Sequence, residues 1–470
     1  MTDAEYLLWL LSVVPVAVVL FSAYMDRQRS LLSPFWGMCF PVFAGTLLTI
    51  SLHLTGTGST ALVDSYAGLR TNQLIVSLYT VVLFVTCTSV AYFSFHADAS
   101  GRTVPVSAFQ RQARLNGMAT IAVTLLILAC SAISLYFLLK ASAGASGVIT
   151  DFSAKRRIEE QSGSVSSGGI YRVIINLTRV NAIALLAVWY RFSNLRRNPH
   201  LLASIFLSTV ITAINSVAIS ERTSLLLLII PLVGTMKAEK VISVTQVIWG
   251  LVLAIIFANL VVIFRPSKGS ETLELNEMIR QTLETPTRFA GNLSGPDVTK
   301  ISRIRMYCDQ QSEFFYGRTF VEWPIAIVPK AIWPNKPVLN LDRFVTQAVY
   351  GGIADVNMGA IPPSLVGECY MNAGWFGILL GGMAYGMALK IYAARLFPQQ
   401  RSTVFSLYAF LISLPLLTHL LTMNYFGQVM IKIGVDLVSG IAVLLVYKQF
   451  ALRETREVEY YLIELDADPV

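Results

Sequence analysis

The chain has 470 residues, of which 54% are hydrophobic and only 14% are charged, and its formal net charge at pH 7 is +8. Soluble domains carry about 25% charged residues, so this composition excludes an ordinary soluble domain. A mean hydropathy of +0.60, with repeated apolar runs of roughly 20 residues, indicates a polytopic helical membrane protein. The cations lie in short clusters between the apolar runs, which argues against a nucleic-acid-binding surface.

The apolar runs predict an all-α polytopic membrane protein with about eleven membrane-spanning helices. The first run follows acidic residues and has neither a basic leader nor a small-residue cleavage site, so we expect a retained span rather than a cleaved signal peptide. The predicted spans lie near residues 6–24, 35–54, 73–96, 117–139, 171–190, 201–219, 223–236, 242–264, 366–389, 404–422 and 428–447.

Every second link between these spans carries a cluster of positive charges. Cytoplasmic loops are enriched in Lys and Arg, so we assign these links to the cytoplasm and the N-terminus to the outer side of the membrane. The clusters are Arg27 with Arg29; Arg102, Arg111 and Arg114; Arg191, Arg196 and Arg197; Lys237 with Lys240; Lys390, Arg395 and Arg401; and Lys448 with Arg453.

This orientation places a long loop, residues 265–365, on the outer side. Its length of about 100 residues is typical of a functional or a disordered connection, and its aromatic and apolar content favours a folded one. The segments ETLELNEMIRQTLETPTRF and DVTKISRIRMYCDQQSEFFYG have apolar positions at helical spacing, which predicts one or two amphipathic helices across the outer face. The chain is thus divided into a bundle of about eight spans over 1–264, this loop, about three spans over 366–450, and a tail over 451–470.

Within the loop, the stretch YGRTFVEWPIAIVPKAIWPNKP combines prolines, tryptophans and cations. Prolines at this density exclude one regular helix, because each lacks an N–H and clashes with the preceding turn. We interpret the stretch as a stiff segment that holds Arg318, Lys330 and Lys336. It would also present Trp323 and Trp333 to sugar or lipid, although for these two tryptophans we favour an interfacial aromatic belt that anchors the loop at headgroup level.

Three motifs carry a resemblance to a known family. They are NSVAISERTSLLLLIIPLVG, in which an Arg-containing turn joins two spans, the stretch YGRTFVEWPIAIVPKAIWPNKP, and PPSLVGECYMNAGWFG, which leads back into the membrane. Together they resemble the oligosaccharide repeat-unit polymerases, also called O-antigen or Wzy-type polymerases. The likeness is detailed over about 300–380, and elsewhere it follows hydropathy and loop layout. The family often has Arg where this chain has Lys330, and Lys lacks the bidentate fork of Arg.

The resemblance implies a GT-C-like glycosyltransferase at the periplasmic face of the bacterial inner membrane, with its C-terminus in the cytoplasm. Its donor would be a growing glycan on undecaprenyl diphosphate, and its acceptor would be the non-reducing sugar of another lipid-linked repeat unit. The chain would grow at its reducing end and release undecaprenyl diphosphate. The implied partners are the lipid bilayer, a chain-length regulator and a flippase, with no nucleic acid and no cofactor.

A lipid diphosphate brings two or three negative charges to the membrane boundary, so its binding calls for cations near the headgroup plane. Arg222 fits best because almost no loop separates the two spans around it, although a snorkelling arginine that merely ends a helix is the structural alternative. Arg303 and Arg305 are two residues apart and would face different directions on a helix, so we expect at most one to touch phosphate. The full set of predicted diphosphate contacts is Arg222, Arg303, Arg305, Arg318, Lys330 and Lys336.

Attack by a sugar hydroxyl needs a base on the outer side, and Glu368 in GECY is the first choice because the chain re-enters the membrane there. Its alternative role is a structural carboxylate paired with an arginine. His419, near the outer end of its predicted span, is a second catalytic candidate, although a lone intramembrane histidine usually makes one interhelical hydrogen bond. Further predicted contacts to sugar or lipid are Trp323, Trp333, Asn372 and Tyr316.

Metal, cofactor and disulfide signals are weak. Outer acidic residues occur singly, the histidines are scattered, and neither a Walker-type loop nor a dinucleotide fingerprint is found, so we predict a metal-independent reaction without a cofactor. Cys308 and Cys369 both fall in the polar region between the two groups of spans, and spacing alone leaves open whether they form a disulfide.

Two other functions stay open at this stage. A ligase that moves a lipid-linked glycan onto another acceptor would have the same layout. A flippase or transporter for lipid-linked sugars is the rival from another class. Transporters usually show repeats of broken helices with charges near the bilayer midplane, whereas we see no such repeat and expect the charges to gather at the outer boundary.

Overall fold

The structure is a computed structural model of the chain. It describes residues 2–26, 33–54, 69–95, 113–143, 168–218, 222–239, 241–243, 245–246, 297–327, 333, 341–349, 361–396, 403–421 and 425–454. Within these ranges nearly all regular structure is helical, and eight helices are long and apolar enough to cross a membrane. The protein is therefore an all-α polytopic membrane protein, as its composition predicts.

The eight long helices coincide with eight of the predicted spans. They are Asp3–Met25, Pro34–Ser51, Thr71–Ser94, Gly117–Phe137, Tyr171–Arg191, Pro199–Ser216, Ser364–Ala394 and Phe426–Phe450. The predicted spans 223–236 and 404–422 correspond to shorter apolar helices, Leu227–Ala238 and Val404–Leu417. The predicted span 242–264 lies almost wholly outside the described residues.

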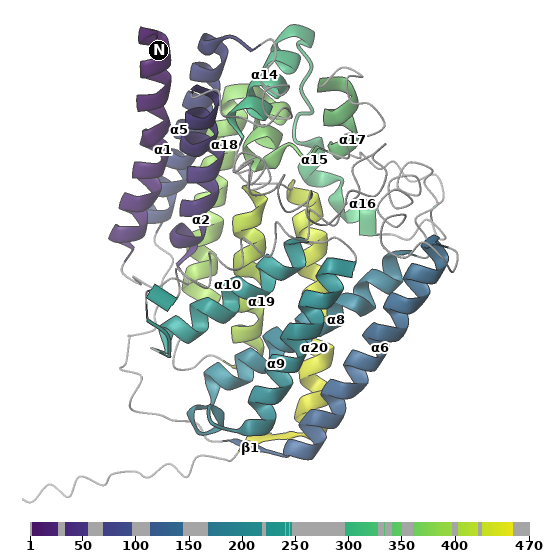
Figure 1. Cartoon of the computed structure of the whole chain (residues 1–470). Coiled ribbons are helices and arrows are strands. Elements are labelled where there is room, and N and C mark those ends of the chain that lie inside the picture. Colours follow the sequence, from purple (N-terminus) through teal and green to yellow (C-terminus); the bar gives the residue numbers. More distant parts are fainter. Residues whose placement is uncertain are drawn as a thin grey trace, which may run out of the picture.

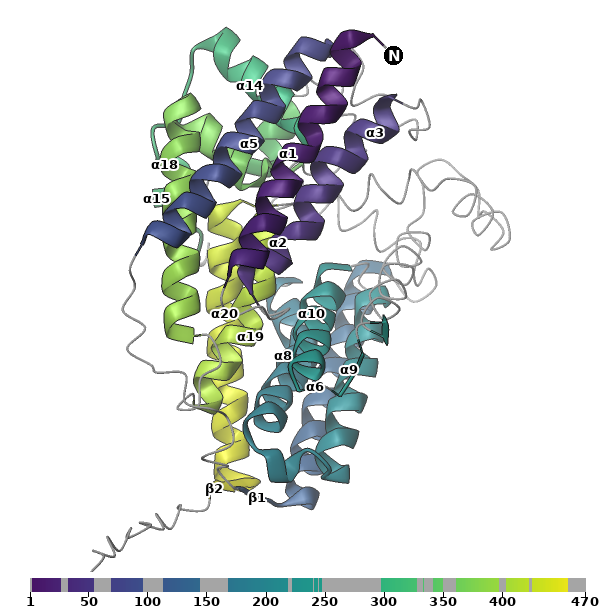
Figure 2. The ribbon, with the colours of Figure 1, turned by 90° about the vertical axis from the view of Figure 1, so that its left-hand side faces the viewer.

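The helices form two bundles, one in the upper part and one in the lower part of Figures 1 and 2. We call one the first bundle; it contains α1 (Asp3–Met25), α2 (Pro34–Phe43) with its continuation η1 (Ala44–Leu48) and α3 (Thr49–Leu54), α5 (Thr71–Ser94), α14 (Val298–Gln311) and α18 (Ser364–Leu396). The second bundle contains α6 (Gly117–Ala143), α8 (Gly168–Arg191), η4 (Ser193–Leu195), α9 (Pro199–Ala218) and α10 (Arg222–Ala238).

Two C-terminal helices, α19 (Val404–Leu420) and α20 (Phe426–Phe450), pack against both bundles. They appear in yellow and yellow-green between the two groups of helices in Figure 2. We predicted domain boundaries at residues 264 and 366 from the order of the spans along the chain. In space, the helices of residues 1–264 separate into two bundles, and the C-terminal helices join these bundles.

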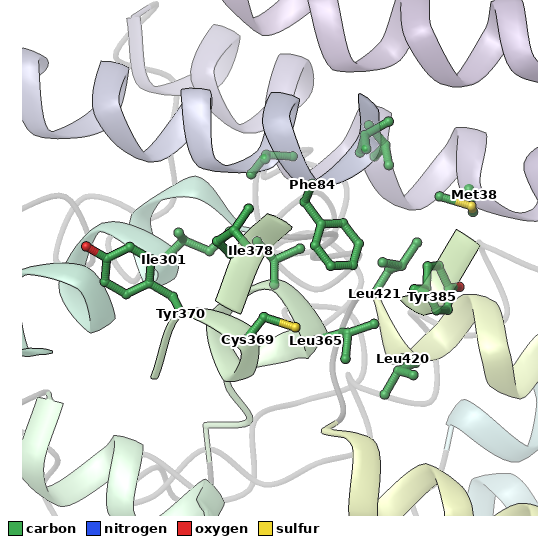
Figure 3. Close-up of a cluster of buried hydrophobic side chains, with 14 of the residues drawn as sticks. Met38, Phe84, Ile301, Leu365, Cys369, Tyr370, Ile378, Tyr385, Leu420 and Leu421 are labelled. Atoms are coloured by element: carbon green, nitrogen blue, oxygen red, sulfur yellow. The ribbon is translucent and has the colours of Figure 1, made fainter. Parts of the chain in front are cut away.

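The core of the first bundle is apolar and lies where α5, α14 and α18 meet (Figure 3). Phe84 of α5 and Ile301 of α14 both reach this core, and the ring of Tyr385 in α18 lies near that of Phe84, with centroids 6.0 Å apart and planes tilted by 33°. The Tyr385 hydroxyl donates to the carbonyl of Leu417 in α19 at 2.9 Å. A buried tyrosine is tolerated here because its polar end finds a carbonyl partner.

Helix α18 approaches α5 through glycines. A Cβ added at Gly386 would lie 2.2 Å from the carbonyl oxygen of Thr88, and one added at Gly382 would lie 2.8 Å from that of Phe84. Only residues without a side chain allow two backbones to come this close, which is a common way for membrane helices to associate. The glycines of α18 therefore fix its position on α5.

The outer loop folds into short helices, as its aromatic content predicts. Asp297 caps α14 by accepting a hydrogen bond from the N–H of Thr299 at 2.9 Å, and this helix confirms the amphipathic helix expected in DVTKISRIRMYCDQQ. The proline-rich stretch begins as two short helices, α15 (Arg318–Val321) and α16 (Trp323–Ile327), and α17 (Leu341–Phe344) with η5 (Val345–Val349) follows later. The segment ETLELNEMIRQTLETPTRF lies outside the described residues.

A small ribbon that we did not predict joins the ends of the second bundle. Strand β1 (Ala113–Leu115) pairs antiparallel with β2 (Leu452–Glu454), and Arg114 lies opposite Arg453. Asn194, after α8, donates to the carbonyl of Ala113 at 2.7 Å, and Arg196 pairs with Glu239 after α10. The ends with predicted cytoplasmic charge clusters thus meet on one side of this bundle.

Helix ends next to predicted cytoplasmic charge clusters also meet in the first bundle. Asp26, after α1, accepts hydrogen bonds from Ser33 at 2.5 Å and from the hydroxyl of Tyr92, near the end of α5, at 3.3 Å. Lys390 of α18 lies over the Tyr92 ring, 4.8 Å from its centroid. The alternation of positive links therefore groups helix ends correctly within each bundle, while the assignment of that side to the cytoplasm stays a prediction.

Candidate functional site

The site begins at a break in α18. Helical backbone angles are interrupted near Gly374, whose φ is +55°, so the carbonyls before the break lack helical partners. The N–H of Phe315 donates to the carbonyl of Met371 at 2.9 Å. The N–H of Tyr316 donates to the carbonyl of Asn372 at 2.9 Å. The break therefore binds the start of the proline-rich stretch to the outer end of α18.

Asn372 strengthens this connection with its side chain. Its amide nitrogen donates to the hydroxyl of Thr319 at 2.6 Å and to the carbonyl of Glu368 at 2.8 Å. Its amide oxygen accepts from the N–H of Gly317 at 2.9 Å, where a φ of +84° suits glycine. Asn372 is buried and its amide is saturated by these contacts, so here it holds α15 beside Glu368.

Glu368 is fully buried, with 0% of its surface exposed. One carboxylate oxygen, Oε2, accepts a hydrogen bond from the backbone N–H of Phe426 at 2.6 Å. Phe426 is the first residue of α20, so the carboxylate lies at the positive end of that helix, which stabilises its charge. The arginine pairing considered for Glu368 is not seen within the described residues; its partner is a helix N-terminus.

The other oxygen of Glu368, Oε1, is buried and has no hydrogen-bond partner among the described residues. The hydroxyl of Thr319 lies near this carboxylate, but its oxygen accepts the Asn372 amide and its geometry toward Oε1 falls short of a hydrogen bond. A buried acceptor without a partner costs about 1–3 kcal/mol. Such a group is a reasonable candidate for chemistry, since a substrate hydroxyl would satisfy it.

Two ionisable side chains, Asp342 of α17 and Tyr425 before α20, lie near Glu368, and Asp342 also lies near Lys300. Burial lowers the pKa of Lys300 in α14, although Asp297 and Asp342 oppose this effect. Burial also raises the pKa of Tyr425, before α20, and the charges of Asp342 and Glu368 add to it. Tyr425 therefore lies near both carboxylates, at the point where the outer helices meet α20.

Tyr425 also lines a cavity of about 270 Å³ between α8 and α20. Its polar lining includes Arg172 and Asn176 from α8 and Lys432 from α20, and Asp436 and Ser439 lie deeper along α20. The walls between them are apolar and are formed by Val173, Val180, Ile431 and Val435. Along α20 the lining extends over about 21 Å, at 1.5 Å per residue, so the cavity is an elongated slot with two cations in its upper half.

A buried ion pair lies beside the lower part of the slot. Nη2 of Arg179 in α8 donates to both carboxylate oxygens of Asp436 in α20, each at 2.7 Å, and the arginine side chain is 0% exposed. Both residues lie about 15–17 Å along their helices from the N-terminal ends, well inside two of the apolar helices that are long enough to cross a membrane. This finding corrects the expectation that charges gather at the outer boundary.

Sequence reasoning missed these charged residues, although a signal was present. Arg172 and Arg179 lie in the predicted span 171–190, seven residues apart and so on one face of a helix. Lys432 and Asp436 lie in the predicted span 428–447 with a spacing of four. Ionisable residues inside a span mark functional sites by default, so the spacing of charges within these two spans was the signal.

The structure brings the start of α10 to this cavity. The hydroxyl of Ser224 donates to the amide oxygen of Asn176 at 3.1 Å, and Arg222 is the first residue of α10. The Arg222 backbone is thus two residues from a direct contact with the cavity wall, while its side chain lies outside the described part. The predicted role of Arg222 in binding diphosphate stays a prediction with a suitable location.

The other predicted cations that the structure describes do not line this cavity. Arg318 is 56% exposed, pairs with Glu322 one turn later, and is not among the cavity residues. Arg305 contacts Asp309 at 3.3 Å, and Arg303 is half-buried on the same helix, α14. Their diphosphate roles stay predictions, and Lys330 and Lys336 lie outside the described residues.

The predicted aromatic contacts separate in space. Trp323 is half-buried and packs against the first turn of α20, where a Cβ added at Gly427 would lie 2.8 Å from its own Cβ. Trp333 and Tyr316 are exposed, Tyr316 to 82%. His419 belongs to α19, but its side chain lies outside what the structure describes. Trp323 therefore has a packing role, and the sugar or lipid contacts stay predictions.

Metal ligands and a disulfide are absent from the ranges that the structure describes. No group of three or more His, Cys, Asp or Glu side chains there could hold a metal ion. Cys308 and Cys369 are both buried free thiols, and burial raises the pKa of Cys308 to about 12. The disulfide left open by the sequence is therefore not formed, and Cys308 is an inert packing residue.

These helices and this slot define a class: a polytopic helical membrane protein with a polar cavity between two of its spans. A family model described as "Domain of unknown function (DUF8712)" matches residues 82–397, more than half of the chain. The protein belongs to this family. The matched region includes α8 and Glu368 and ends before α20. Neither the curated proteins nor the solved structures contained a match to this chain.

Proposed function

We propose that this protein is a GT-C-like membrane glycosyltransferase that polymerises oligosaccharide repeat units linked to undecaprenyl diphosphate. The reaction would take place at the periplasmic face of the bacterial inner membrane and release undecaprenyl diphosphate. The motifs at residues 300–380 and around Arg222 supply the resemblance on which this proposal rests. The geometry adds an observation that the resemblance did not use.

That observation is the slot between α8 and α20. Its two cations, Arg172 and Lys432, lie among valine and isoleucine side chains. A polyprenyl diphosphate combines the complementary properties, because a head with two or three negative charges is joined to an apolar chain. Cations in a membrane protein are far less hydrated than in water, so their attraction for such a head is strong. The slot therefore fits this class of lipid better than a neutral lipid or a soluble sugar.

Glu368 has the environment of a general base. In the proposed step, Oε1 takes the proton of the acceptor hydroxyl, and the hydroxyl oxygen forms a bond to the anomeric carbon of the donor. The bond from that carbon to the phosphate oxygen breaks, and its electron pair leaves with the diphosphate. Arg172, Lys432 and the predicted Arg222 would stabilise the charge that develops on this leaving group. Tyr425 supports the assignment because it adjoins both the slot and Glu368.

The test is a reconstituted reaction with purified lipid-linked repeat unit. Glu368→Gln keeps an acceptor for the Phe426 N–H but cannot take a proton, so we expect polymer formation to fall by about 100-fold or more. Lys432→Met and Arg222→Ala each remove one cation, and we expect losses of about 10- to 100-fold. Lys390→Met is the matched control, because that lysine lies over Tyr92 far along α18 from the site.

The expected result is a ladder of polymer from the wild type and the Lys390 variant only. Equal ladders from all four variants would refute the site. Transfer of a single repeat unit to a different acceptor, without a ladder, would favour the ligase.

The pair of Arg179 and Asp436 inside two spans favours a second candidate, a transporter of lipid-linked sugars. A transporter must open the predicted cytoplasmic end of its bundle. The β1–β2 ribbon and the contact of Asn194 with Ala113 close that end here. This closure supports the polymerase.

A cross-link separates the two functions. Arg114 and Arg453 lie opposite each other across the ribbon, and paired strand positions are 4.5–5.5 Å apart, about the Cα separation that a disulfide needs. Arg114→Cys combined with Arg453→Cys should form a disulfide that leaves polymerisation intact. If oxidation instead stops movement of lipid across the bilayer and no glycosidic bond ever forms, the protein is a transporter.

A further inference from the structure

The Arg179–Asp436 ion pair makes no contact that the proposed chemistry requires, yet it is the most deeply buried charge pair in the described part of the chain. Arg179 is 0% exposed and does not line the slot, whereas Asp436 does. Arg179 therefore lies behind its partner as seen from the cavity. Its location calls for a role other than direct contact with a ligand.

The geometry of the pair is unusual for arginine. Only Nη2 contacts the carboxylate, and Nε and Nη1 are buried without hydrogen-bond partners among the described residues. An arginine that binds a carboxylate or phosphate side by side normally uses two nitrogens in parallel. Here one nitrogen carries the whole interaction, so a single positive point charge would serve in place of the guanidinium fork.

The pair fixes the register of α8 and α20. Arg172 lies two turns above Arg179 on α8, and Lys432 lies one turn above Asp436 on α20. The hydroxyl of Tyr408 in α19 donates to the carbonyl of Asp436 at 2.7 Å, so a third helix holds the same turn of α20. A shift of α20 by one turn would move Lys432 by 5.4 Å and separate it from Arg172.

We propose that Arg179 is a positioning residue for the slot. Through Asp436 it holds α20 at the height where Lys432 faces the same diphosphate as Arg172. The inference takes the identity of the ligand from the proposed function. It does not require that the protein polymerises that ligand. Its test is therefore the binding of undecaprenyl diphosphate to the purified full-length protein, measured by native mass spectrometry together with thermal unfolding.

Three variants separate positioning from the alternatives. Arg179→Met leaves Asp436 unpaired and should weaken binding by about tenfold. Arg179→Lys retains one positive charge on α8 and should bind within about threefold of wild type, because only one nitrogen of Arg179 is used. Arg179→Met combined with Asp436→Leu removes both charges, and such apolar replacement of a buried pair usually preserves folding. Its binding should stay about tenfold weak, because apolar contacts do not set register.

The matched control is Ser216→Ala in α9. It removes a buried hydroxyl that donates to the carbonyl of Thr212 in its own helix at 2.8 Å, so no contact between α8 and α20 is lost. We expect its binding to stay within about threefold of wild type.

Each other outcome overturns the inference. Weak binding by Arg179→Lys would show that the fork contacts the anion directly. Recovery in the double variant would show that the pair only balances charge. Wild-type affinity of the Arg179→Met variant would show that Arg179 has no role in positioning the slot. If the wild type does not bind undecaprenyl diphosphate, both proposals fall, whereas wild-type binding without polymer formation overturns the proposed function alone.

Discussion

The two bundles hold their helices together mainly by different means. In the first bundle, glycines of α18 bring its backbone against α5, and most buried hydroxyls, such as those of Thr80 and Thr88, donate to carbonyls of their own helix. A hydrogen bond of 2.8 Å from Ser22 of α1 to Ser89 of α5 is an exception. In the second bundle, buried polar groups bridge between helices. Asn181 of α8, for example, donates to Ser208 of α9 and accepts from Tyr447 of α20. Lipid supplies no hydrophobic driving force between helices, and these are the two remaining ways to associate them.

The difference bears on function. Close backbone packing leaves no room between α5 and α18, so the first bundle supplies a rigid support for the broken end of α18 and Glu368. Polar bridges hold the helices of the second bundle at defined heights, and the slot with its charged lining lies between α8 and α20. The first bundle has a larger cavity, about 740 Å³ between α1 and α5, but its lining includes no charged side chain. The proposed reaction would therefore use one bundle to fix the base and the other to receive the lipid.

The largest effect should follow from adding one methyl group to the first bundle. Gly386→Ala places a Cβ 2.2 Å from the carbonyl oxygen of Thr88, so α18 must move away from α5. We expect a loss of about 2–3 kcal/mol in the free energy of unfolding, measured by thermal unfolding in detergent.

The same change in α20 is the control, because a Cβ at Gly434 meets nothing within 4 Å. Gly434→Ala should stabilise the protein by about 0.5–1 kcal/mol. Equal unfolding midpoints for the two variants would show that α18 is not packed through its glycines.

A smaller effect should follow from removing one polar bridge in the second bundle. Thr124 of α6 shares a hydrogen bond of 2.9 Å with the hydroxyl of Tyr447 in α20. Thr124→Val removes this interhelical bond, and we expect a loss of about 0.6–1.7 kcal/mol. Thr80→Val in the first bundle removes only a hydrogen bond to the carbonyl of Val76 in its own helix, so it should be near neutral. An equal loss of unfolding free energy in the Thr80→Val and Thr124→Val variants would contradict the proposed difference between the two bundles.

Much of the fold could be predicted from the sequence, because membrane spans are set by local composition. The run from Asp297 to the end of α14 likewise carries its own cap and helical period. Glu368 was chosen from its place beside the membrane boundary, and its burial agrees with that reasoning. These features depend on neighbouring residues, which a single sequence displays directly.

The slot and the ion pair could not be found in that way. Arg179 and Asp436 are 257 residues apart, and only the packing of α8 against α20 brings them together. Strands β1 and β2 are three residues long, too short for a period to be seen. Charges inside two spans were visible, but their pairing depends on tertiary register, which no local pattern specifies.

The smallest predicted effect concerns Lys300, the buried cation beneath the outer helices of the first bundle. Burial lowers its pKa below 10.5 in the folded protein. Between the folded pKa and 10.5 the unfolded chain binds more protons than the folded chain, so raising the pH through that interval stabilises the fold. The gain is at most about 1.4 kcal/mol per pH unit.

Thermal unfolding at several pH values between neutrality and 10.5 should show this rise in the wild type, on top of any effect of the tyrosines that both variants share. Lys300→Met has no proton to release, so its curve should be flatter over the same range. Parallel curves would mean that Lys300 reaches water in the folded protein. In that case Lys300 would be solvated beneath the short helices of the 265–365 loop. The contrast between the two bundles would then hold only for their membrane-spanning helices.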